Sequence, residues 1–199
     1  MITITIANKT FNLPEQWSDI KLKTYLKYIN LANSDVELDK FKLIEVLCGV
    51  EPDYLDDLTM DQFNQLSSQL AELTIKFPEI STVQSKPYFT IDGINYVTRK
   101  INTMNDLTLG EYVSIDIVRK NHIDDFIPYI LAIIIRPGQL IIDEETKEER
   151  WEIEPFNKKD IKNLDYRANL FKEKVSTDDL IPTLNFFLNM KEELEMNIQ

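Results

Sequence analysis

The chain has 199 residues, of which 43% are apolar and 10% aromatic, and its formal net charge is −12. This length and composition are typical of a globular protein with one large core or two small ones. The charge opposes direct binding to nucleic-acid phosphate, and four glycines without GxGxxG or GxxxxGK[ST] spacing exclude the usual phosphate-binding loops.

The single cysteine and the length of the longest apolar run indicate whether disulfides or membrane-spanning helices are to be expected. Cys48 allows no internal disulfide, and its place in the apolar run 43–50 is typical of a small buried side chain. The apolar run 127–135 is far shorter than the roughly 20 residues of a membrane-spanning helix, so we expect a core helix and no membrane span. Because a strand pattern follows Met1 directly, we expect no signal peptide and a cytoplasmic setting for the newly made chain.

Residues 1–76 predict a β-hairpin followed by three helices. Isoleucine and threonine alternate from residue 2 to residue 6, and Asn8 and Lys9 provide a turn, so residues 2–13 are expected to form a hairpin with one buried face. A helix with an apolar stripe comes next, for which Ser18 or Asp19 is the expected cap. Two more helices are predicted at 35–50 and 59–75.

Residues 77–87, which contain two prolines, are expected to link this first unit to a second unit at 88–199. The second unit begins with a predicted hairpin around Asp92-Gly93, because this dipeptide supplies the positive φ angles of a tight turn. Helices are predicted at 109–118 and 126–135, the latter ended by Arg136-Pro137-Gly138. An inserted hairpin with an acidic tip is predicted at 139–156, before helices around 161–171 and from 177 to about 196.

The two units resemble each other in sequence. The segment Asp-Ile-Lys-Leu-Lys-Thr-Tyr at 19–25 returns 87 positions later as Asp-Leu-Thr-Leu-Gly-Glu-Tyr at 106–112. The helices that begin at Thr59 and Thr177 match at an offset of 118. We therefore predict an α+β fold, mostly helical, with two related hairpin-and-helix units from an internal duplication. Chance agreement between two amphipathic segments is the alternative.

Side chains that could support catalysis are few. His122 is the only histidine, and no second histidine or neighbouring cysteine completes a metal or catalytic set, so a solvated loop residue is expected. The aspartates at 53–57 and the acidic tip at 143–149 lack the spacing of a calcium loop and predict solvated surface. A nuclease-like set can be assembled from Asp143, Glu145 and Lys147, but it lies within an acidic run that would repel nucleic acid. We expect no catalytic, cofactor-binding or metal-binding residue.

Aromatic residues at strand and helix starts are expected in the core, because a base-stacking surface normally comes with a basic groove. They are Phe11, Trp17, Tyr25, Tyr88, Tyr96 and Tyr112. The candidate partner contacts are instead exposed polar side chains on the acidic tip and on the polar face of the helix that begins at Thr59. They are Glu144, Glu145, Glu148, Glu149, Gln62, Gln65 and Gln69. The polar face of the helix that begins at Thr177 is a further candidate.

Several segments carry a resemblance to a known group of proteins. They are the isoleucine-rich opening hairpin, Trp-Ser-Asp-Ile-Lys-Leu at 17–22, the segment at 106–112, Leu-Ala-Ile-Ile-Ile-Arg-Pro at 131–137 and Tyr-Arg-Ala-Asn-Leu-Phe at 166–171. In these segments the chain resembles small proteins encoded among the structural genes of tailed phages, especially crAss-like phages of gut bacteria. They are packing and helix-entry motifs, so the resemblance implies no catalytic residue.

The resemblance implies a non-enzymatic virion component, either a cargo protein held in the capsid or the portal and tail barrel, or a ring part of the connector. A tail assembly chaperone that is absent from the finished particle is the first alternative, and a metal-dependent enzyme is the second. The expected partners are other phage structural proteins of the portal and tail barrel, with a homo-oligomeric ring as one arrangement. The negative charge would help a protein stored beside packaged DNA to avoid adhesion.

Overall fold

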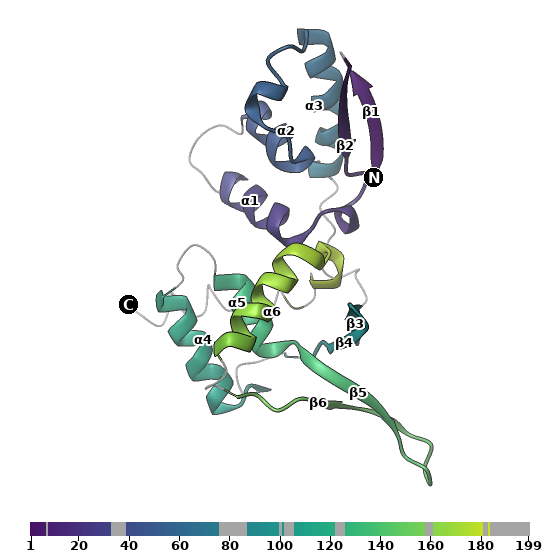
Figure 1. Cartoon of the computed structure of the whole chain (residues 1–199), viewed down its shortest axis with the longest axis vertical. Helices are drawn as coiled ribbons and strands as arrows, with labels where there is room; N and C mark the ends of the chain where they lie inside the picture. The colour runs from purple at the N-terminus through teal and green to yellow at the C-terminus, as the bar shows by residue number, and fades with distance from the viewer. Residues whose placement is uncertain are drawn as a thin grey trace. The chain divides into compact units, whose positions relative to one another are not determined.

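The computed structural model describes residues 1–6, 8–32, 39–75, 87–99, 101, 106–121, 126–157, 161–180 and 183 (Figure 1). It confirms a mixed α+β chain that is mostly helical. The chain divides into two compact units: unit 1 contains Met1–Thr82 with Ser176–Asp178, and unit 2 contains Val83–Val175 with Asp179–Gln199. The division falls inside the predicted linker 77–87, of which residues 77–86 lie outside the described residues.

Unit 1 begins with a two-stranded hairpin. β1 (Ile2–Ile6) and β2 (Lys9–Leu13) pair antiparallel, with Ile4 opposite Phe11 and Ile6 opposite Lys9. Lys9 is therefore already part of the second strand, and the predicted turn at Asn8 and Lys9 lies one residue too late. Asn8 has the positive φ angle, 61°, that a two-residue hairpin turn requires.

Helices complete unit 1. They are η1 (Trp17–Asp19), α1 (Leu22–Ala32), α2 (Lys40–Cys48), η2 (Pro52–Tyr54) and α3 (Met60–Ile75). α2 packs against α1, α3 and β2, and the core between them includes the fully buried Phe11, Leu22, Ile44, Leu66 and Leu70. α2 ends at Cys48, and the following Gly49, with a left-handed φ of 65°, caps the helix.

The start of α1 differs from the prediction. The Asp19 carboxylate accepts hydrogen bonds from the Met1 amino group at 2.7 Å and from the Glu15 amide at 3.1 Å. The helix begins three residues later at Leu22, and the Tyr25 amide donates to the Lys21 carbonyl at 3.0 Å to close its first turn. The positive amino group is thus the partner of Asp19, in place of the helix amides that the sequence suggested.

Unit 2 contains a four-stranded antiparallel sheet in which the strands lie in chain order. The strands are β3 (Tyr88–Ile91), β4 (Ile94–Val97), β5 (Arg136–Ile142) and β6 (Glu149–Ile153). β3 and β4 form the predicted hairpin, with positive φ angles at Asp92 and Gly93. The pairing between β4 and β5 is short and involves only Arg136 and Pro137 of β5, whereas β5 and β6 pair along their length. The predicted inserted hairpin is observed, although Arg136, Pro137 and Gly138 already belong to its first strand.

Three helices accompany this sheet: α4 (Leu109–Asn121), α5 (Phe126–Ile134) and α6 (Ile161–Lys174). α5 packs against α4 and α6, and residues 130–135 of α5 and its end are buried. The ring of Phe171 in α6 lies edge-on to Phe89 of β3 and Tyr96 of β4, with centroid distances of 5.6 and 5.2 Å. These rings join α6 to one face of the sheet.

The two hairpins share their turn length and two buried positions. Ile6 and Ile91, which directly precede the two turns, are each 8% exposed. Phe11 of β2 and Tyr96 of β4 lie opposite Ile4 and Phe89 in their hairpins, and both are buried. A helix then begins at Leu22 in unit 1 and at Leu109 in unit 2, at the predicted offset of 87. The order hairpin, helix, helix is therefore common to both units, and its origin in duplication stays an interpretation.

The repeated heptapeptide nevertheless buries different side chains in the two units. In α1, Leu22 and Tyr25 are buried, whereas the matching Leu109 and Tyr112 of α4 are 78% and 41% exposed. α4 instead buries Glu111, Ile115 and Val118. The expectation that Tyr112 belongs to the core is wrong, because α4 turns Glu111 inward to meet two arginines.

The last described residues of the chain are divided between the two units. Ser176–Asp178 belong to unit 1, where Ser176 forms a β-bridge with Lys21. The buried Thr177 donates twice to the Ile20 carbonyl, from its amide at 2.9 Å and from its hydroxyl at 2.8 Å. A helical turn begins at Thr177 as predicted, and most of the predicted final helix lies outside the described residues.

Candidate functional site

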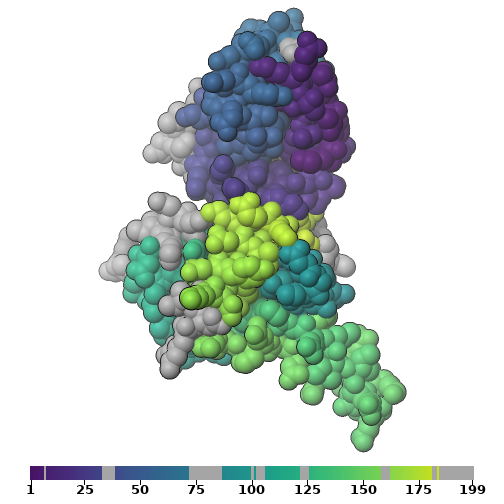
Figure 2. Space-filling view, in the orientation of Figure 1, coloured from purple at the N-terminus to yellow at the C-terminus, as the bar shows by residue number. Residues whose placement is uncertain are grey.

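The β5–β6 hairpin continues well beyond its pairing with β4, and we call residues 138–154 the arm. Every residue from 142 to 150 is exposed, so this end of the hairpin adds nothing to the core of unit 2. Figure 1 shows β5 and β6 extending away from the helices of unit 2, and Figure 2 shows the same residues as a narrow green projection. A hairpin with this much free surface is suited to contact with another molecule.

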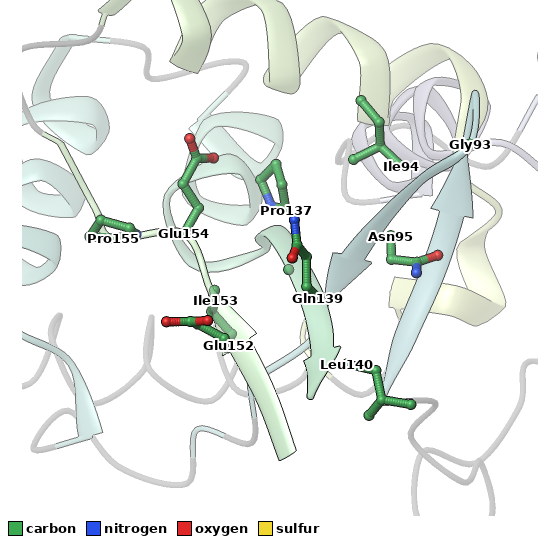
Figure 3. A pocket seen from close by; sticks show the side chains of 11 residues that line it. Gly93, Ile94, Asn95, Pro137, Gln139, Leu140, Glu152, Ile153, Glu154 and Pro155 are labelled. Atoms are coloured by element: carbon green, nitrogen blue, oxygen red, sulfur yellow. The ribbon is translucent and has the colours of Figure 1, made fainter. Parts of the chain in front are cut away.

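At the base of the arm the sheet surrounds a hollow of about 780 Å³. Its lining comes from the β3–β4 turn on one side and from β5, β6 and the residues after β6 on the other (Figure 3). The residues are Gly93, Ile94, Asn95, Pro137, Gly138, Gln139, Leu140, Glu152, Ile153, Glu154 and Pro155. The volume falls in the range of pockets that bind small molecules or short peptide segments, about 300–1,000 Å³.

The chemistry of the hollow combines carboxylates, amides and hydrocarbon. Gln139 lies directly opposite Glu152 in the β5–β6 pair, so the two side chains share one face of the sheet. Glu154 follows just past the end of β6, where its amide donates a hydrogen bond to the Pro137 carbonyl at 2.9 Å, and it also lines the hollow. Ile94 and Pro137 supply apolar surface. This lining can bind a cationic group with a hydrocarbon stem, and its residues include no serine, threonine, cysteine, lysine or histidine.

The face of the arm opposite Gln139 and Glu152 is largely apolar, and two of its residues, Leu140 and Ile153, also line the hollow. Strand alternation places Leu140 and Ile142 of β5 on the same face as Trp151 and Ile153 of β6. Leu140 is 43% exposed and Ile142 is 53% exposed. The Trp151 ring lies 4.6 Å from the ring of Tyr88, which is itself 41% exposed. The expectation that Tyr88 belongs to the core is therefore wrong: it extends the apolar face of the arm onto β3.

The acidic tip has a defined loop. The Asp143 carboxylate accepts hydrogen bonds from the Glu145 amide at 3.0 Å and the Thr146 amide at 2.8 Å, and these bonds hold its pKa below the usual range. Lys147 adopts a positive φ of 59° and donates its amide to the Asp143 carbonyl. The candidate contacts Glu144, Glu145, Glu148 and Glu149 are all exposed around this loop. Asp143 is one member of the nuclease-like set considered above. Its carboxylate is engaged in these hydrogen bonds within the turn, which is a structural role.

The glutamines of α3 are placed differently from one another. Gln65 and Gln69 are exposed on the polar face of the helix, as expected. Gln62 is only partly exposed, and its side-chain oxygen accepts from the Thr59 amide at 2.9 Å, while Thr59 Oγ1 accepts from the Gln62 amide at 3.4 Å. This reciprocal pair is a capping box, so Gln62 is engaged in holding the start of α3.

A buried charge cluster lies at the start of α4. Glu111 is fully buried, and its Oε1 accepts from Arg99 Nη1 at 2.6 Å and lies 2.9 Å from Arg136 Nη2. Its Oε2 accepts from the Thr108 amide at 2.8 Å, which completes a second capping box. Burial alone would raise the pKa of Glu111, but the Thr108 amide and the two arginines outweigh it and lower the pKa. The residue type was visible in the sequence, but its burial was not.

The acidic residues of the described part of the chain are spread apart or engaged in other contacts. No three His, Cys, Asp or Glu side chains there are grouped so that they could hold a metal ion. In the cluster at 53–57, Asp57 forms an ion pair with Lys9 at 3.0 Å, and Lys9 also donates to the Tyr54 carbonyl at 2.8 Å. His122 lies outside the described residues.

No described helix is both long enough and apolar enough to span a membrane. In comparisons with known proteins, no protein-family model, curated protein or solved structure matches the chain. The features that bear on function are the arm, the hollow and the charge of the chain.

Proposed function

We propose that this protein is a non-enzymatic component of a tailed-phage particle, either a cargo protein held in the capsid or the portal and tail barrel, or a ring part of the connector. The observation that carries the proposal is the arm. Its residues 142–150 are all exposed, so they are available to a partner and contribute little to folding of unit 2. The sequence resemblance to phage structural-region proteins supplies the setting.

The net charge supports the same proposal. A chain of net charge −12 is repelled by DNA phosphate, which suits a protein that lies beside packaged or moving DNA without binding to it. The hollow also suits the binding of a partner, because its lining combines carboxylate, amide and hydrocarbon groups. The expected partners are other structural proteins of the portal and tail barrel.

The test is quantitative mass spectrometry of purified particles of the phage that encodes the chain, before and after DNA ejection, with the portal protein as the internal count. Presence before ejection and loss afterwards would identify ejected cargo. Presence in both samples at a whole-number ratio to the portal would identify a connector part. Absence from both samples would refute the proposal and leave the two alternatives, a tail assembly chaperone that binds its partner and is then released, and a metal-dependent enzyme.

A further inference from the structure

We propose that the hollow at the base of the arm binds a short basic segment of a partner protein, with lysine or arginine side chains beside Glu152 and Glu154. This inference rests on the proposed function, because it names the chemistry of the partner that the arm would contact. Both glutamates are exposed and line the hollow together with Gln139. The two carboxylates attract a cation, and the amide can accept a further hydrogen bond.

The apolar part of the lining is suited to the stem of such a side chain. Lysine and arginine carry three or four methylene groups before the charged head, and these groups pack well against hydrocarbon. Ile94 of β4, which is 45% exposed, and Pro137 of β5 provide that surface (Figure 3). The volume of about 780 Å³ exceeds that of a single side chain and leaves room for a segment of several residues.

The net charge of the whole arm favours a basic partner over an acidic one. Residues 138–154 contain seven carboxylates and two basic side chains, a net charge of −5. A second copy of this chain would bring an equal negative charge to the arm, and nucleic acid would bring its phosphates, so both are repelled. A basic protein segment is attracted over the whole length of the arm and steered toward the hollow at its base.

The experiment uses the full chain and a fluorescein-labelled nine-residue peptide of alternating lysine and valine, with binding measured by fluorescence anisotropy at low salt. Two matched peptides replace each lysine by glutamate or by serine. We expect the lysine peptide to bind, the other two to bind at least tenfold more weakly, and added salt to weaken the binding. Equal binding of all three peptides would overturn the proposal.

Two double variants separate the hollow from general attraction by the arm. E152Q/E154Q removes the two carboxylates of the hollow, and E144Q/E145Q removes the same charge from the tip. All four residues are exposed, so both variants should fold, which circular dichroism can check. Because an exposed ion pair is typically worth a factor of up to about five, we expect the loss of two carboxylates in E152Q/E154Q to weaken binding about tenfold. We expect less than a threefold loss for E144Q/E145Q.

Equal losses in the two variants would show attraction by overall charge and would overturn the inference. A dimer of the chain that the lysine peptide dissociates would assign the hollow to a second copy and overturn it as well. Failure here can be told apart from failure of the proposed function. If the chain is present in phage particles but does not bind the lysine peptide, only the inference about the hollow is refuted. If the chain binds the peptide but is absent from particles, only the virion role is refuted.

Discussion

The carboxylate of Glu111 lies 2.9 Å from a guanidinium nitrogen of Arg136, and both side chains are buried in unit 2. This pair connects the first turn of α4 to the first residue of β5, from which the arm extends. Arg99 reaches the same carboxylate oxygen and also donates to the Asp106 carbonyl. The cluster therefore fixes the base of the arm, and its loss should be felt in the stability of unit 2.

Replacing Glu111 by glutamine should destabilise the protein strongly. The amide keeps the size of the side chain but leaves the buried charge of Arg136 without its counter-ion, a change that typically costs about 3–5 kcal/mol. Urea unfolding followed by circular dichroism would measure the loss. Adding Arg136→Met to Glu111→Gln should recover part of it, because the uncompensated charge is then removed and Arg99, which is partly exposed, can be hydrated. A Glu111→Gln variant as stable as the parent would contradict this account.

The stability difference between the parent and Glu111→Gln should depend on pH. The pKa of Glu111 is lower in the folded chain than in the unfolded chain, so the carboxylate favours folding. This contribution is complete above the ordinary glutamate pKa of about 4.3, and it is lost as the pH falls through the folded pKa. Urea titrations at several pH values between 7 and 3 would show a constant difference that shrinks at the acidic end. A difference that stays constant to pH 3 would refute the assignment.

Replacing Gly138 by alanine should destabilise the base of the arm. A Cβ there would lie 2.5 Å from Val97 Cγ2 and 3.0 Å from the Glu152 carbonyl oxygen, so β4 or β6 would have to shift. Overpacking of this kind typically costs about 1–3 kcal/mol. Gly110→Ala is the matched control, since its Cβ would meet only the Phe156 ring, at 3.6 Å, and α4 would gain from alanine. Thermal unfolding should therefore show a lower Tm for Gly138→Ala and an equal or higher Tm for Gly110→Ala.

Replacing Thr177 by valine should weaken unit 1. Valine keeps the branched shape but removes the buried hydroxyl that donates to the Ile20 carbonyl at 2.8 Å. The loss should be about 1 kcal/mol, because the Thr177 amide continues to donate to the same oxygen. Thr5→Val, at an exposed position of β1, is the control and should change the free energy of unfolding by less than about 0.5 kcal/mol. Equal effects at the two positions would show that the hydroxyl at 177 has no special role.

Cys48 should react slowly with thiol reagents while the protein is folded. Burial raises the pKa of its thiol to about 12, so very little thiolate exists at pH 8. The thiolate is the reactive form of cysteine. Reaction with Ellman's reagent should be slow in buffer and fast in concentrated urea, where the thiol regains its ordinary pKa. In the structure Cys48 is partly buried. Rapid reaction under both conditions would show that the folded protein does not shield the thiol and would contradict this prediction.

Local patterns in the sequence were enough to predict most elements of the two units. Alternating isoleucine and threonine gave the first hairpin, and Asp92-Gly93 gave the second with its turn in place. Helical spacing of apolar residues gave α3 and α5 to within a residue or two at each end. These features depend on neighbours in sequence, through backbone preferences and the spacing of apolar side chains. The arm was also visible, because two apolar strands flank an acidic loop.

Other features depend on residues that lie far apart in the sequence. The matching segments at 19–25 and 106–112 both begin helices, but only the packed structure turns Tyr25 inward and Tyr112 outward. Glu111 is buried because Arg99 and Arg136 supply two positive charges at that point. The hollow likewise exists only where the β3–β4 turn comes beside β5 and β6.

The sequence by itself therefore determined the class of fold, the order of the elements and the acidic character of the arm. The tertiary structure decided which side chains of the repeated segment are buried, that Ser176–Asp178 return to unit 1, and that Glu152 and Glu154 share a hollow with Ile94. The physical reason is that local conformation follows from the preferences of adjacent residues, whereas burial and charge pairing are set by whichever distant side chains the fold brings into contact.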